Sequence, residues 1–153
     1  MGYSSSPPPY VPLTLLNATS ATKTPAASGQ YMSMSSSSIA LTVGTWLVHA
    51  SCDFGNSGTP LYTACVFGIY GANGADSATV PTLLSATSNL TVNSVFNAAQ
   101  SRIEASANEQ IIMSPTMIVT VTATVTIYPV PFAAITTAAN ARVITYITGQ
   151  KIY

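Results

Sequence analysis

The stretch Thr45-Trp46-Leu47-Val48-His49-Ala50-Ser51-Cys52-Asp53-Phe54 alternates apolar and polar side chains. Every second residue from Trp46 to Phe54 is apolar. The opposite face is polar with Leu47 as the exception, and it carries Thr45, His49, Ser51 and Asp53. This period of two is typical of a β-strand with one buried face. We therefore expect Trp46, Val48 and Phe54 to lie in the core of a β-sheet protein.

Further short segments rich in β-branched and aromatic residues surround this strand. The predicted strands are Ser38 to Thr42, Leu61 to Tyr70, Thr116 to Val121, Val125 to Val130, Ala141 to Ile147 and Gln150 to Tyr153. The predicted turns between them are Val43-Gly44, Gly55 to Pro60, Gly71 to Asp76 and Thr148-Gly149.

Two of these strands carry additional information. Residues 61 to 70 are apolar on both faces, which predicts burial on both sides. One face has Cys65, Phe67 and Ile69; the other has Tyr62, Ala64, Val66 and Tyr70. Pro129 and Pro131 lack the N–H that a central strand donates, so we expect a sheet edge or a bend there.

The region 77 to 110 is the hardest to interpret. Short strands are predicted at Asn89 to Val95 and at Ser101 to Ala105, and a helical turn over Ser94 to Gln100 is the alternative.

Many short strands separated by turns predict an all-β protein with one domain, a β-sandwich or jelly roll, over residues 36–153. Residues 1–35 are rich in Pro and Ser and predict an extended N-terminal arm. The arm carries large apolar side chains, which a purely disordered tail rarely has. It is therefore either a flexible end or a segment that binds a neighbouring subunit. In the second case the contact residues are Tyr3, Tyr10, Leu13, Leu15 and Leu16.

Charge is scarce, because only 5% of the residues are Asp, Glu, Lys or Arg and the formal net charge is zero. An ordinary soluble domain has about 25% charged residues. A surface so poor in charge favours association. The few scattered basic residues argue against a nucleic-acid partner and against binding to a membrane surface.

The sequence contains little that indicates catalysis. His49 is the only histidine, and Asp53 follows it on the same strand face. We expect His49 to be a surface or interface residue, and we predict no catalytic residues, no metal site and no cofactor. Cys52 and Cys65 are expected to be buried free thiols, although a disulfide stays conceivable if their strands pair. The eight tyrosines either pack in the core and at its rim, or several of them anchor subunit contacts.

The segment from Ser38 to Ala50, with its Gly44-Thr45-Trp46-Leu47-Val48 step, resembles a strand–turn–strand pattern of small virion proteins of tailed bacteriophages. The strands Val119 to Tyr128 and Ala141 to Ile147 are similar to the C-terminal part of the same proteins, which is usually more basic. The resemblance covers residues 38 to 70 and 116 to 153. It implies a jelly-roll structural protein of the phage particle, either a capsid cement (decoration) protein or a trimeric tail-associated β domain.

From this resemblance and the scarcity of charge we expect a non-enzymatic structural protein. It would sit on the capsid exterior of a virion assembled in the host cytoplasm, where it bridges neighbouring capsid subunits. Its partners would be the major capsid protein and itself, as a dimer or trimer. The alternative is a tail-fibre or tail-tip domain that binds a host receptor or glycan, with the loop Gly71 to Asp76 and Tyr70 as its candidate site.

Overall fold

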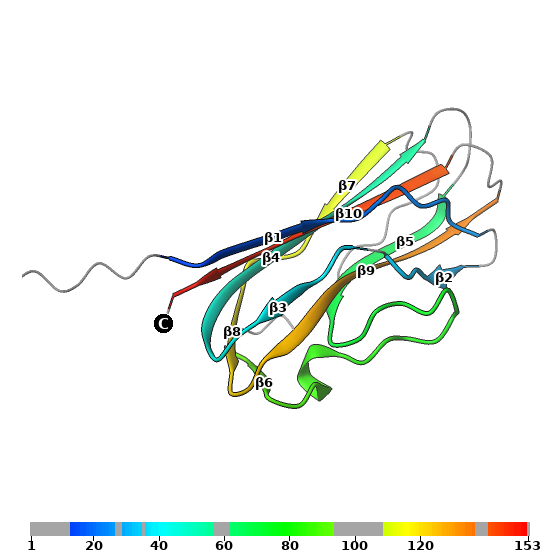
Figure 1. The fold of residues 1–153 in the computed structure, drawn as a ribbon. Helices are drawn as coiled ribbons and strands as arrows, with labels where there is room; N and C mark the ends of the chain where they lie inside the picture. Colours follow the sequence, from blue (N-terminus) through cyan, green and yellow to red (C-terminus); the bar gives the residue numbers. More distant parts are fainter. Residues whose placement is uncertain are drawn as a thin grey trace, which may run out of the picture.

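The protein is an all-β sandwich of two antiparallel sheets in a computed structural model (Figure 1). The structure describes residues 13–26, 29–34, 36–56, 62–93, 109–136 and 141–152. Its strands are β1 (Leu15–Thr19), β2 (Gln30–Tyr31), β3 (Ile39–Leu41), β4 (Gly44–Asn56), β5 (Tyr62–Tyr70), β6 (Leu90–Val92), β7 (Glu109–Met113), β8 (Met117–Val121), β9 (Val125–Ile135) and β10 (Ala141–Lys151). The helical content of the described residues is one short 3-10 turn, Leu84–Ala86.

The larger sheet has the order β1-β10-β4-β8-β6, and β7 also pairs with β4. β7 and β8 lie along the same strand, since β7 pairs with residues 51–55 of β4 and β8 pairs with residues 44–48. Ser114 bridges the interruption between them. Its amide N–H donates to the Ala50 carbonyl (2.8 Å), and its hydroxyl accepts the Ala50 amide N–H (2.9 Å).

The smaller sheet has the order β2-β9-β3, and β5 pairs with the other side of β9. The predicted strand end at Pro129 and Pro131 is wrong, because β9 continues through both prolines to Ile135. The Pro131 carbonyl accepts the amide N–H of Met32 (2.9 Å). Since the N and O of one strand residue point to the same side, the missing N–H of Pro131 faces the interval between β2 and β3. An uninterrupted ladder with β5 is therefore compatible with these prolines.

The core lies between the two sheets and matches the alternation along β4. Trp46, Val48, Ala50, Cys52 and Phe54 are all buried, as is Phe67 of β5, so the predicted core residues are confirmed. The indole N–H of Trp46 donates to the Thr42 carbonyl (2.9 Å), which satisfies its polar atom inside an apolar environment.

One residue of β5 was assigned to the wrong face. A register shift between Tyr62 and Ala64 places Tyr62 opposite Ile135, on the core side. A β-bulge inserts one residue and so reverses the alternation that sequence pattern alone assumes. The Tyr62 hydroxyl donates to the Gly55 carbonyl (2.9 Å) and also lies 3.0 Å from the Arg142 carbonyl.

The predicted turn at Thr148-Gly149 is also wrong, because β10 runs unbroken from Ala141 to Lys151. Gly149 is buried, and a Cβ placed on it would lie 2.8 Å from the Ile39 Cδ1 atom. This glycine provides space for the packing of two sheets and does not form a turn.

The sandwich extends further toward the N-terminus than residue 36, where the arm was expected to end. β1 pairs with β10, and β2 pairs with β9. Met32 and Met34 are buried in the core. Leu15–Thr19, Gln30–Tyr31, Met32 and Met34, all within the expected arm, therefore belong to the sandwich. Tyr3 and Tyr10 lie outside the described residues, as do the strand predicted at 101–105 and the helical turn predicted at 94–100.

Candidate functional site

The outer face of the smaller sheet is covered by the protein itself. Val130 and Tyr70 are only 0% and 3% exposed, although their side chains point away from the core. Tyr31 packs against Tyr70 with its ring centroid 6.1 Å away and against Phe132 at 4.9 Å. The predicted burial on both sides is confirmed for the C-terminal half of β5, where Phe67 to Tyr70 are all buried, whereas Thr63 is exposed. Burial raises the pKa of Tyr70 to about 12.

A segment from Gly71 to Leu83, here called the strap, provides this cover. The Gly71 amide N–H donates to the Thr82 carbonyl (2.8 Å), and Tyr31 exchanges backbone hydrogen bonds with Ser77 (2.7 Å) and Asp76 (2.9 Å). In Figure 1 this segment is drawn in green and runs below β9 and β5. The strap therefore pairs with the edge of the smaller sheet while it lies across the sheet's outer face.

Side chains fasten the strap to the segment around Ser33. Lys23 Nζ pairs with Asp76 and also donates to the Ser33 carbonyl (2.8 Å), while the Ser33 amide N–H donates to Asp76 Oδ1 (2.9 Å). Partial burial opposes ionisation of Asp76, but these hydrogen bonds and the Lys23 charge outweigh it and lower the pKa of the carboxyl. Asn73 accepts the Met34 amide N–H (3.2 Å) in a similar manner.

These contacts bear on the loop proposed for glycan binding. Aromatic residues that bind sugars present an open ring face, but Tyr70 is 3% exposed and packs against Tyr31. Tyr70 is therefore unsuited to that role. Residues 71–76 belong to the strap, and hydrogen bonds to Asn73 and Asp76 fasten it to the segment around Ser33.

The outer face of the larger sheet is different, because apolar side chains from four strands are exposed on it. We call this surface the bare face. Direct cross-strand partners lie on the same side of a sheet. The registers place Leu47 beside Ile118, and they place Ser51 between Tyr146 and Met113 and Asp53 between Ile144 and Ile111. The apolar members of the bare face are Leu15, Leu47, Ile111, Met113, Ile118, Ile144 and Tyr146.

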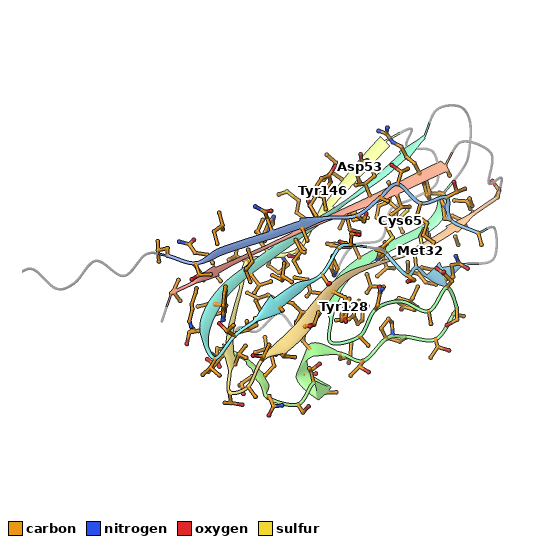
Figure 2. The ribbon with its side chains drawn as sticks, viewed as in Figure 1. Met32, Asp53, Cys65, Tyr128 and Tyr146 are labelled. Carbon is orange, nitrogen blue, oxygen red and sulfur yellow. The ribbon has the colours of Figure 1, made fainter. Side chains whose placement is uncertain are left out.

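Exposure is high across the bare face. Leu15, Ile111 and Met113 are 64%, 65% and 63% exposed, and Ile118 and Tyr146 are 39% and 40% exposed. Figure 2 shows Tyr146 and Asp53 on the upper side of the molecule, above β10 and β4, while Tyr128 lies on the opposite side. Exposed apolar side chains that gather on one sheet face mark an interaction site more often than ordinary surface does, and here they form two groups on either side of the row Asn17, Thr148 and His49.

The polar groups of the bare face lie between its apolar members: Asn17, Thr148 and His49 form one cross-strand row, and Gln150, Ser51 and Asp53 lie in the neighbouring rows. His49 is half-buried in the centre, and its carbonyl accepts a long hydrogen bond from the Thr148 hydroxyl (3.4 Å). Asp53 Oδ2 lies 3.6 Å from Arg142 Nη2 at one end. Four residues along a strand span about 13 Å, so His49 and Asp53 share a face without forming a hydrogen-bonded pair.

The structure describes three of the five predicted contact residues, and of these Leu15 is the strand residue on this face. Leu15 lies at its edge, Leu13 precedes β1 and is 60% exposed, and Leu16 points inward and packs against the core. The other members of the bare face were missed by sequence reasoning. Ile111 and Met113 lie on β7, for which no strand was predicted. Ile118 lies on a predicted strand with apolar residues on both sides, which do not indicate which side is covered.

Thiols, metal-ligating groups and membrane-spanning helices are the remaining features that could indicate a site. Cys52 and Cys65 are buried and free on strands of different sheets, and burial raises the pKa of both thiols, that of Cys65 to about 12. In the part of the chain that the structure describes, no group of His, Cys, Asp and Glu is arranged to hold a metal ion. The same part has no helix of the length and hydropathy needed to span a membrane.

Compared with models of known protein families, with curated proteins and with solved structures, the chain matches none of them. The bare face is therefore assigned from its own geometry.

Proposed function

We propose that this protein is a non-enzymatic structural protein of a bacteriophage particle. It binds on the capsid exterior as a jelly-roll cement protein and bridges neighbouring capsid subunits, including the major capsid protein. The observation that carries the proposal is the bare face, on which Ile111, Met113 and Tyr146 are exposed although the fold has an ordinary core. The resemblance of residues 38–70 and 116–153 to small virion proteins of tailed bacteriophages is the reason for proposing a phage particle.

The size of the bare face suits a stable protein contact. β10 has 11 residues, and five strands lie in the order from β1 to β6. Since β1 has five residues and β6 three, the 42 strand residues of the sheet cover about 670 Å² at about 3.3 Å per residue and about 4.8 Å per strand. A specific interface of standard size buries about 800 Å² on each partner.

The residue types of the face suit a weakly charged protein surface better than a strongly charged partner. Tyrosine, methionine and isoleucine are residue types favoured at interface centres. The Asp53–Arg142 pair lies at the end of the face, where a polar rim is expected. A particle carries many copies, so that modest contacts at each position add up to a firmly held layer. Residues 1–12, which include Tyr3 and Tyr10, would act as the arm that reaches an adjacent subunit.

The experiment compares occupancy of the protein on particles that lack it and are then supplied with purified variants. Met113→Lys places a charge in the bare face and should reduce occupancy at least tenfold. Val80→Lys is the matched control, because Val80 is 53% exposed on the strap, on the other side of the molecule. Equal occupancy for the two variants, or no binding of the unmodified protein, would contradict the proposal.

Two further measurements test bridging. Particles that lack the protein should release DNA at a lower temperature than complete particles, and identical release curves would count against a cement role. Deletion of residues 1–12 leaves β1 intact and isolates the arm. If occupancy is unchanged by this deletion, the arm has no part in binding.

A further inference from the structure

β1 forms an edge of the larger sheet that is open to pairing. In an antiparallel ladder, alternate residues direct their backbone N–H and C=O groups to opposite sides of the strand. Lys151 donates to the Thr14 carbonyl (2.9 Å) and Ser20 donates to the Thr145 carbonyl (2.9 Å), so the even-numbered residues face β10. Leu15, Asn17 and Thr19 therefore direct their backbone groups outward.

Within the described residues, no strand pairs with this outer side of β1. Leu15, Asn17 and Thr19 are all exposed. Edge strands of soluble proteins are commonly protected by charge, proline, a bulge or shortness. The sequence Leu-Leu-Asn-Ala-Thr has no charge and no proline, and its register with β10 is regular.

The other edges of the two sheets are less available. β6, at the far edge of the larger sheet, has only three residues. β5 is long, but Thr63 is the one exposed residue in it, and its ends carry a register shift and a bridge to Leu83. β7 pairs only with β4 among the described strands, but it begins with the charged Glu109. β1 is therefore the open edge that lacks charge.

We propose that β1 pairs antiparallel with β1 of a second copy of this chain, about a two-fold axis at Asn17. In this register Asn17 faces its own copy, and Leu15 faces Thr19 of the second copy. The three outward residues of each chain then form up to about six backbone hydrogen bonds. The absence of charged side chains along β1 means that no like charges meet at the axis.

The pairing would join the two larger sheets into one. Leu15 and Tyr146 lie on the outer side of the larger sheet, so the two bare faces would become continuous and nearly double in area. This inference does not depend on the phage proposal, because it concerns the free protein in solution. A single strand pair is a small contact, so we expect a dimer that dissociates on dilution.

Sedimentation equilibrium of the full chain over a wide concentration range tests the pairing. The unmodified protein should show a reversible monomer–dimer equilibrium. Asn17→Pro removes the central outward N–H, which β10 does not use, and proline is tolerated on an edge strand in this position. This variant should weaken the dimer at least tenfold while its midpoint of unfolding by urea stays that of the unmodified chain.

Asn17→Thr is the matched control, because it keeps the N–H and should leave the dimer within about twofold of the unmodified protein. Met113→Lys is a second control, which should weaken a dimer formed through the bare face but not one formed through β1. A strictly monomeric protein, or a dimer that Asn17→Pro leaves intact, would overturn the proposal.

A charge exchange tests the two-fold axis itself. Asn17→Lys and Asn17→Glu should each be monomeric, because like charges meet at the axis, and their mixture should form a heterodimer. Failure of the mixture to associate while the unmodified chain dimerises would place the axis elsewhere and overturn the register. These readouts need no virus particle, so their failure is distinct from failure of the proposed capsid role.

Discussion

The outer faces of the two sheets of this sandwich differ in how far their side chains are exposed. The smaller sheet buries Val130 and Tyr70 beneath its own strap, while the larger sheet leaves Ile111 and Met113 more than half exposed. The outer face of the larger sheet also carries polar residues, but its exposed Ile111 and Met113 are as apolar as the covered Val130, so composition alone does not explain the difference. It arises because the chain supplies a covering segment for one sheet, and in the described residues leaves the other open. We infer that the smaller sheet is completed by folding and that the larger sheet is completed by association.

The largest effect is expected from substituting a tyrosine on each face. Tyr70→Ala should lower the free energy of unfolding by about 3 kcal/mol, because a buried aromatic ring leaves a cavity. Tyr146→Ala should lower it by about 1 kcal/mol or less, because Tyr146 is 40% exposed. Urea denaturation of the two variants at one protein concentration measures the difference. Equal losses would mean that the bare face is already covered within the free protein, and the contrast between the sheets would fail.

A second substitution tests whether the strap is required for the cover. Gly74 lies so close to β2 that a Cβ would be 2.2 Å from the Met32 carbonyl oxygen, a backbone atom that has little freedom to move. Gly74→Ala should therefore destabilise the protein by about 2 kcal/mol. The amide protons of Tyr31 and Asp76, which bond across this contact, should exchange faster. Ala75→Ser, at the exposed neighbouring position, is the control and should change neither quantity.

The strands were predictable where alternation is simple. The period of two in residues 45–54 identified both the strand and its buried face, and β3, β6 and β8 lie within the ranges expected for them. The errors occurred where a single residue has more than one structural use. Gly149 accommodates Ile39 but was predicted as a turn, and the missing N–H of Pro131 lies where no partner strand requires it.

The candidate site was less predictable than the fold. The low charge predicts that this chain associates, which stays a prediction, and sequence reasoning selected Leu15, which lies at the edge of the bare face. It did not select Met113 or Ile118, because their exposure depends on which sheet the strap covers. That choice is made by distant contacts such as Lys23 with Asp76, which no local pattern records.

The smallest effect is expected at this fastening of the strap, and it should depend on pH. The folded-state pKa of Asp76 lies below the ordinary value of 3.8. Its interaction with Lys23 and Ser33 therefore adds stability above the ordinary pKa, and that stability is lost as the pH falls through the folded value. Because the pair is partly exposed, Asp76→Asn should cost only about 0.5 kcal/mol at neutral pH.

The difference between Asp76→Asn and the unmodified protein should stay constant from pH 7 to about pH 5 and shrink toward zero below the ordinary pKa. Urea unfolding at a series of pH values measures it, with Asp53→Asn as the comparison on the bare face. A difference for Asp76→Asn that persists undiminished at pH 3 would show that ionisation of this carboxyl does not hold the strap. Its cover of the smaller sheet would then rest on the backbone hydrogen bonds of Tyr31 with Ser77 and Asp76 and on the packing of Tyr31 against Tyr70.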